Sequence, residues 1–132
     1  VLVGSGKTVY VYTSNSYFRA FNIQYQANRI AINASSDIFA SDVINKVVRS
    51  YDIFGNYWNE QIGPFQGVAD LAIDSGNRIY VLDSISKNIQ VFNSDRSFLT
   101  KFSFSDQEAI PVDLAVGSDG RVSVGYSNLE TP

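Results

Sequence analysis

The 132-residue sequence contains no cysteine, no histidine and no methionine. Without cysteine the chain cannot form a disulfide bond or a thiolate metal site. Without histidine it lacks the commonest general base and the commonest transition-metal ligand. These absences weigh against an enzyme and against a bound metal or cofactor. Because position 1 is valine, we expect the chain to be mature, trimmed or part of a longer protein.

Positive charge and long apolar runs are also scarce. The sequence contains ten Lys and Arg residues and thirteen Asp and Glu residues, which gives a net charge of −3. Affinity for nucleic acid rests mainly on neutralising backbone phosphates, and anionic membranes likewise attract basic segments. A membrane span needs about 20 consecutive apolar residues, which the sequence does not contain. The sequence therefore predicts no nucleic-acid partner and no membrane span.

Aromatic and β-branched residues are abundant, and they follow a repeated pattern. Aromatic residues make up 14% of the chain, and such residues suit half-buried strands. Each repeat has three apolar residues, a four-residue polar turn and a second alternating segment. The four copies of this pattern cover Val1–Thr13, Ile30–Asp42, Leu71–Asp83 and Leu114–Tyr126.

The repeat predicts the fold. A period of about 40 residues with four strand-length segments is typical of β-propeller blades, each a four-stranded antiparallel meander. We predict an all-β chain that forms a single propeller segment over residues 1–132. The expected repeat units are approximately 1–28, 29–66, 67–110 and an incomplete 111–132. This makes an incomplete ring of about three blades.

An incomplete ring leaves apolar sheet faces exposed at both ends. Three interpretations follow from this. The chain is a segment of a longer protein, it completes a ring with a second copy of itself, or it stacks its terminal faces on other subunits.

Two stretches carry a resemblance to a known family. Residues 67–102 read GVADLAIDSGNRIYVLDSISKNIQVFNSDRSFLTKF, and residues 111–124 read PVDLAVGSDGRVSV. Both resemble the NHL-repeat propellers of the six-bladed type. The third repeat matches the family pattern throughout, the fourth matches as far as it extends, and the first two match in outline. The resemblance implies a propeller related to binding modules, amidating lyases and lactonases, and it leaves the number of blades open.

Asp70 and Asp113 hold equivalent positions at the entry to two inner strands. In a propeller this entry borders the central channel, so the carboxylates could surround a polar ligand or a cation such as calcium. The alternative is that each accepts backbone N–H groups from the adjoining blade. Arg29 holds the same position in the second repeat, where it either interrupts the ring of acids or pairs with a neighbouring one.

Three further positions are candidates for binding or modification. Tyr57 and Trp58 could bind a sugar or a protein, or they could pack on opposite faces of an outer strand. Asn33 begins an N-glycosylation sequon at a hairpin turn. Asp42 and Asp83 follow equivalent strands, where each carboxylate would accept backbone N–H groups two or three residues further on.

These features favour a non-enzymatic interaction or structural-assembly module. Its exposed blade faces would be covered by a protein partner or by self-association. The alternative is a fragment of a propeller enzyme, of the metal-dependent lyase or lactonase type, whose catalytic residues lie mostly outside this chain. The sequon and the absence of cysteine and methionine favour an extracellular or cell-surface location.

Overall fold

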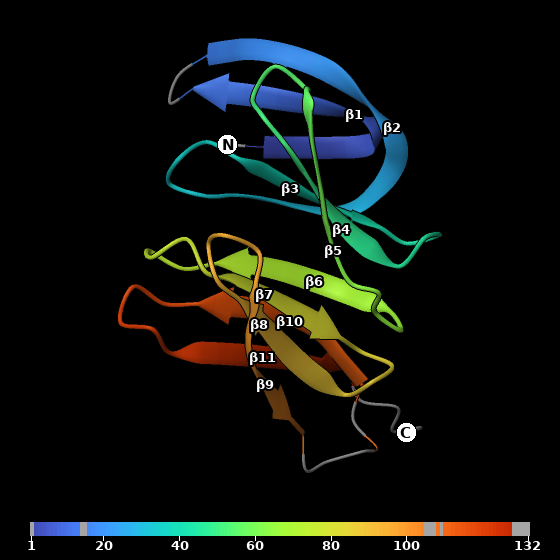
Figure 1. Cartoon of the computed structure of the whole chain (residues 1–132), viewed down its shortest axis with the longest axis vertical. Helices are drawn as coiled ribbons and strands as arrows, with labels where there is room; N and C mark the ends of the chain where they lie inside the picture. The colour runs from blue at the N-terminus through green and yellow to red at the C-terminus, as the bar shows by residue number, and fades with distance from the viewer. Residues whose placement is uncertain (1, 14–15, 105–107, 109, 128–132) are drawn as a thin grey trace. The chain divides into compact units, whose positions relative to one another are not determined.

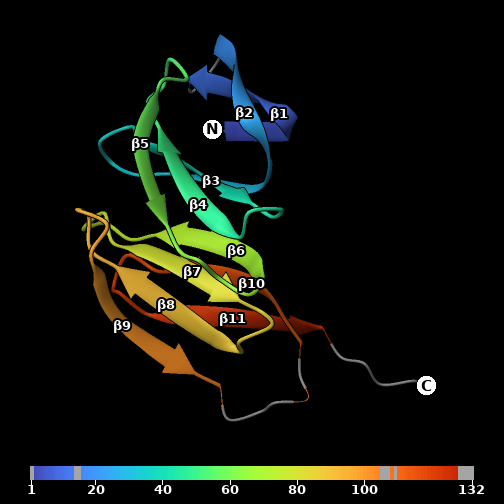
Figure 2. The same ribbon diagram turned by 45° about the vertical axis from the view of Figure 1, so that its right-hand side comes forward.

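The computed structural model describes residues 2–13, 16–104, 108 and 110–127, which form eleven strands and no helix. The predicted all-β class is therefore confirmed. In the described residues no helix of a length and hydropathy suited to crossing a membrane occurs. The chain divides into two units, residues 1–64 and 65–132, which Figures 1 and 2 show in blue to green and in green to red.

The first unit is one five-stranded antiparallel sheet in which each strand pairs with the next along the chain. Its strands are β1 (Leu2–Thr13), β2 (Ser16–Ile32), β3 (Ile38–Asp42), β4 (Val47–Tyr51) and β5 (Tyr57–Ile62). A meander of this kind is what short polar turns between alternating segments predict.

Strand β2 departs from the expected repeat boundaries, because the boundary near residue 28 falls inside it. Residues 16–32 contain neither glycine nor proline, so no turn separates the first repeat from the second and the two share a sheet. The strand instead curves (Figure 1), with a register shift between Ala27 and Ile30. The curvature lays the β1–β2 ribbon against β3 and β4. The resulting core cluster consists of Val9, Val11, Ile23, Ile38, Ala40 and Tyr51.

The second unit contains the four-stranded meander that the third repeat predicts. Its strands are β6 (Val68–Ile73), β7 (Ile79–Asp83), β8 (Asn88–Phe92) and β9 (Phe98–Ser103). A separate two-stranded ribbon, β10 (Ile110–Val116) and β11 (Val122–Ser127), packs against one side of this sheet. The core between them consists of Tyr80, Leu82, Ile89, Val91 and Leu114.

Five hairpins share one turn geometry. In each, the first loop residue accepts an N–H from the residue three further on and donates its own N–H to the carbonyl four further on. The fourth residue of each loop has a positive φ, as expected for a type I turn followed by a left-handed bulge residue. These five residues are Ser36, Gly55, Asn77, Arg96 and Gly120. The polar turns predicted in the second, third and fourth repeats are thus confirmed, at residues 33–36, 74–77 and 117–120. The polar segment of the first repeat instead lies within the continuous strand β1.

Candidate functional site

Asp70, Asp113 and Arg29 occupy the same structural position, at an irregularity of an inner strand. A bulge at this point turns a side chain away from the regular alternation of the sheet, and bulges are frequent beside functional sites. The three register shifts fall between Val68 and Asp70, between Pro111 and Asp113, and between Ala27 and Ile30.

The structure brings Asp70 and Asp113 together on the neighbouring strands β6 and β10. The backbone N–H of Leu114 lies 2.9 Å from Asp70 Oδ2 and 2.9 Å from Asp113 Oδ1. The other oxygen of Asp70 accepts the N–H of Leu71 at 2.8 Å. The expectation that such an aspartate accepts an N–H from the adjoining blade is confirmed for Asp70.

This arrangement raises the pKa of Asp70. Burial raises the pKa of Asp70, and the side-chain hydrogen bond with Asp113 raises it further, against the lowering effect of the N–H groups of Leu114 and Leu71. A like charge nearby disfavours ionisation of a carboxyl group, as burial does. The described residues hold no group of three or more His, Cys, Asp or Glu side chains that could bind a metal ion.

Arg29 lies on β2 in the first unit and is exposed. Its backbone N–H donates to Ser41 Oγ at 2.8 Å, and its guanidinium lies 3.4 Å from the carbonyl oxygen of Asn28. The structure therefore ties the Arg29 backbone to β3, while the equivalent aspartates belong to the second unit.

Tyr57 and Trp58 are neighbours on β5 with different surroundings. The Tyr57 ring lies 5.5 Å from that of Tyr51, and its hydroxyl lies 3.3 Å from the Arg49 guanidinium. Trp58 is 49% exposed. Tyr57 is thus engaged within its own sheet, whereas Trp58 is accessible.

Arg49, which sequence reasoning did not single out, is the centre of the network around Tyr57. It forms an ion pair with Asp42 at 3.3 Å, donates to Gln61 at 3.1 Å, and stacks 4.0 Å from the centroid of the Tyr25 ring. One guanidinium therefore joins strands β2, β3, β4 and β5. An alternation pattern could not have revealed it, because its partners come from three other strands, β2, β3 and β5.

Asn33 is only 8% exposed. Its amide nitrogen donates to Asp37 at 2.9 Å, and its amide oxygen accepts the N–H groups of Ser35 and Asp37. The side chain closes the β2–β3 turn. A glycan on this nitrogen would displace the hydrogen bond to Asp37.

Asp42 and Asp83 form turns in the predicted way. Asp42 Oδ1 accepts the N–H groups of Ile44 and Asn45, two and three residues on. Asp83 Oδ1 accepts those of Ile85 and Ser86 in the same manner. The prediction for this pair is confirmed.

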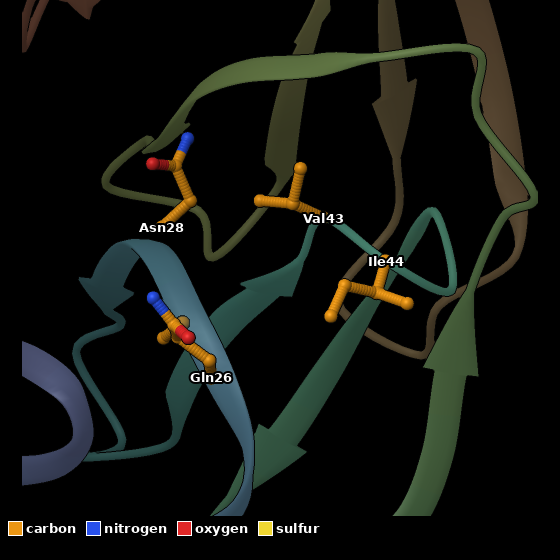
Figure 3. Close-up of a pocket in the computed structure, with 5 residues that line it drawn as sticks. Gln26, Asn28, Val43 and Ile44 are labelled. Atoms are coloured by element: carbon orange, nitrogen blue, oxygen red, sulfur yellow. The ribbon is translucent and has the colours of Figure 1, made fainter.

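A hollow of about 240 Å³ lies beside the bulge of β2. Figure 3 shows Gln26 and Asn28 on one side and Val43 and Ile44, from the β3–β4 turn, on the other. Ile44 is 83% exposed. The hollow is small and shallow. Its lining combines the side-chain amides of Gln26 and Asn28 with the aliphatic side chains of Val43 and Ile44.

Each two-stranded ribbon exposes the side that does not pack on its own unit. The β1–β2 ribbon exposes Tyr10, Tyr12 and Tyr17, which we call the tyrosine face. The β10–β11 ribbon exposes Ala115, Ser123 and Gly125, which we call the small-residue face. A hollow of about 250 Å³ lies on this ribbon, bordered by these three residues together with Asp113, Leu114 and Val124.

Solved structures with the same architecture are β-propeller proteins. Kuenenia stuttgartiensis hydrazine synthase matches 97% of this chain and 38% of its own, with a TM-score of 0.75 and 14% identity. Kluyvelomyces marxianus Hsv2 matches 95% of this chain and 42% of its own, with a TM-score of 0.67 and 11% identity. AztD from Citrobacter koseri matches 77% and 30%, with a TM-score of 0.59 and 13% identity.

The chain is built of β-propeller blades. It spans about two fifths of hydrazine synthase and Hsv2, and identities this low establish the fold alone. No protein-family model and no curated protein sequence matches the chain.

Proposed function

We propose that this chain is a non-enzymatic assembly module made of NHL-like propeller repeats. It acts by holding another protein surface against its uncovered blade faces. The observation that carries the proposal is the exposure of the tyrosine face and the small-residue face on ribbons whose opposite sides are packed as core. Strand faces of this kind are normally covered in a propeller by the next blade.

The outer strand β9 supports the same proposal. Phe98, Leu99 and Phe102 are all exposed on it. Phe98 pairs with Phe92 and Phe102 pairs with Ile89, so the two rings lie on opposite sides of this edge strand. Exposed apolar side chains on an edge strand favour contact with another protein surface.

The mass of the chain in solution, measured by light scattering over a wide concentration range, tests this function. We expect a mass above the 14.6 kDa of one chain. Amides of β1–β2 or β10–β11 should become more protected from hydrogen exchange as the concentration rises. A monomer that unfolds cooperatively at every concentration would contradict the proposal.

The alternative is a fragment of a propeller enzyme, of the metal-dependent lyase or lactonase type. Its favouring observation is the Asp70–Asp113 pair, because a carboxyl of raised pKa beside a second carboxyl is common at functional sites. Metal analysis of the intact protein separates the two functions, since the assembly module requires no bound metal.

We also propose an extracellular or cell-surface location, which rests on the absence of cysteine and methionine and on the sequon at Asn33, where a glycan would replace the hydrogen bond to Asp37. The test is the mass of the chain after expression through a secretory pathway. A glycan at Asn33 would support the location, and an unmodified Asn33 would remove its main support.

A further inference from the structure

The first unit carries a half-buried arginine over two exposed aromatic rings. The Arg19 guanidinium lies 4.3 Å from the centroid of the Phe54 ring and 5.7 Å from that of the Phe18 ring. Phe54 is 57% exposed and Phe18 is 49% exposed. A cation over the face of an aromatic ring is attracted by the ring, so these contacts hold the guanidinium at the surface in a defined place.

Arg19 lies on the packed side of the β1–β2 ribbon. It pairs with Val11, and directly opposed residues of an antiparallel pair point to the same side of the sheet. Val11 belongs to the core cluster of the first unit. Arg19 therefore does not belong to the tyrosine face, and a neighbouring surface that covers the tyrosine face would not cover the guanidinium.

The β4–β5 turn holds the Phe54 ring in place. Asp52 Oδ1 accepts the N–H of Phe54 at 2.8 Å and that of Asn56 at 2.9 Å, which fixes the shape of the turn. Gly55 of the same turn lies directly on Phe21 of β2, where a Cβ would come within 2.6 Å of the ring. Because the guanidinium and the ring are already in position, a ligand that binds there orders few further side chains.

Arg19 differs from three other arginines in its charge balance. Arg49, Arg78 and Arg121 each form an ion pair with an aspartate of their own unit. Within the described part of the chain, the guanidinium of Arg19 has no carboxylate partner and contacts the two rings. A ring face does not neutralise the charge, so the guanidinium N–H groups keep their capacity to bind an anion.

We propose that Arg19, Phe18 and Phe54 bind the carboxylate of an acidic side chain on the protein surface that the module holds. This inference rests on the proposed assembly function and names the chemistry of its partner. A carboxylate accepts two hydrogen bonds from the forked guanidinium, and its single charge matches that of one arginine. The two rings contact the apolar groups beside the carboxylate. The net charge of −3 disfavours nucleic acid, the other ligand that an arginine beside exposed rings accepts.

Two matched peptides test this site. The probes are acetyl-Leu-Glu-Leu-amide and acetyl-Leu-Gln-Leu-amide, which differ in the charge of the central side chain. In NMR titrations of the full chain, the glutamate peptide should shift the signals of the Arg19 Nε–H and the Phe54 amide. Its Kd should be lower than that of the glutamine peptide by about fivefold or more. Sodium chloride at about 0.5 M should weaken the binding, because salt screens exposed charges.

Variants at the arginine separate charge from geometry. Arg19→Gln should abolish the preference for the glutamate peptide. Arg19→Lys should retain only part of it, because an ammonium keeps the charge but lacks the forked donors. Arg121→Gln is the matched control, since Arg121 is exposed on a turn of the second unit, and it should leave the binding unchanged. The dispersion of the amide signals shows that each variant is folded.

Equal affinity for the two peptides would overturn the inference, and so would a preference that survives in Arg19→Gln. Tighter binding of single-stranded oligouridine than of the glutamate peptide would indicate a nucleic-acid surface and would overturn it as well. A mass above one chain without any carboxylate binding would refute this site and leave the assembly function standing. A monomer that binds the glutamate peptide through Arg19 would support the site while contradicting the assembly function.

Discussion

Buried aspartates stabilise individual turns of this fold by accepting backbone N–H groups. The carboxylate of Asp83 is 1% exposed and accepts four backbone N–H groups. Two of them lie in its own turn, and two belong to Gln66 and Gly67, which precede the inner strand β6. One side chain therefore fixes both a turn and the entry of a neighbouring strand.

Asp83→Asn should destabilise the second unit by about 3 kcal/mol. An amide has one acceptor oxygen in place of two and leaves buried N–H groups without a partner, each costing about 1–3 kcal/mol. Urea unfolding, monitored by far-UV circular dichroism, measures the change in the free energy of unfolding. The control is Asp119→Asn, an exposed turn residue whose Oδ1 accepts the Arg121 N–H, for which we expect less than about 1 kcal/mol.

Comparison of Gly55 with Gly120 separates two costs of adding a side chain: backbone strain at positive φ and steric overlap with a neighbouring residue. The two glycines hold the same position in two hairpins, with φ of 88° and 82°. A Cβ at Gly55 would lie 2.6–2.9 Å from Phe21, whereas a Cβ at Gly120 would meet nothing within 4 Å.

Gly120→Ala should therefore cost only the backbone strain, about 1–2 kcal/mol. Gly55→Ala should cost this amount and about 1–3 kcal/mol more, because Phe21 must move. Chemical denaturation of both variants measures the two values. Equal losses would show that Phe21 moves aside without penalty.

At the scale of strands, Arg49 of β4 joins its own strand to β2, β3 and β5 of the first unit. Its planar guanidinium meets the Asp42 carboxylate, the Gln61 amide, the Tyr57 hydroxyl and the Tyr25 ring. A lysine keeps the charge but cannot make the forked contacts or stack as well.

Arg49→Lys should lower the free energy of unfolding by about 1–2 kcal/mol. Arg78→Lys is the matched control, because Arg78 is about half exposed and its ion pair with Asp74 has one partner; its loss should stay below about 1 kcal/mol. Thermal and urea unfolding measure both. Equal effects would show that the Arg49 network adds nothing beyond a single ion pair.

Asp70 and Asp74 should give stability opposite dependences on pH. The folded state raises the pKa of Asp70 above 3.8, so its favourable contribution is complete below that value and is lost as pH rises through the folded pKa. Burial opposes ionisation of Asp74, but hydrogen bonds from Arg78 and Tyr80 outweigh it and lower the pKa. The contribution of Asp74 is therefore present above 3.8 and is lost as pH falls.

Asp70→Asn should gain stability relative to the parent chain as pH rises from 3 to 7, because the amide cannot ionise beside Asp113. Asp74→Asn should lose stability over the same range. Urea midpoints at intervals of pH measure both slopes. Slopes of the same sign would show that folding does not raise the pKa of Asp70.

The sequence was sufficient for the features that depend on local pattern. Alternation and turn residues predicted the meander of residues 67–110, and the position of Asp83 after its strand predicted its hydrogen bonds. The spacing of the repeats also predicted that Asp70 and Asp113 hold equivalent positions at the entries to their inner strands. The pattern did not predict that β2 runs unbroken from the first repeat into the second. The expected boundary near residue 28 followed from the repeat period alone, and no turn residue at that point ends the strand.

The features that sequence reasoning missed arise from contacts between distant segments. Arg49 has partners on three other strands, and the Leu114 N–H reaches Asp70 across 44 positions of the chain. The tyrosine face depends on which side of a ribbon happens to be packed. Such facts follow from tertiary packing, which alternation alone does not specify.

For the whole molecule, stability should be distributed as in a repeat protein, with each small sheet buried against the strands that adjoin it in its own unit. In such a chain, an interface can be lost without the loss of the sheets on either side. The β10–β11 ribbon is the clearest case, since Leu114 joins it to β7 and β8 through Tyr80, Leu82, Ile89 and Val91.

Leu114→Ala should cost about 3 kcal/mol, as expected for a buried leucine that leaves a cavity. The loss should fall on the ribbon, so amides of β10 and β11 should exchange with solvent faster while those of β7 and β8 keep their protection. Val112→Ala, at an exposed position of the same strand, should change neither. A uniform loss of protection across β6–β11 would show instead that the ribbon and the four-stranded sheet unfold as one cooperative body, and the ribbon would then be an integral part of that sheet's core.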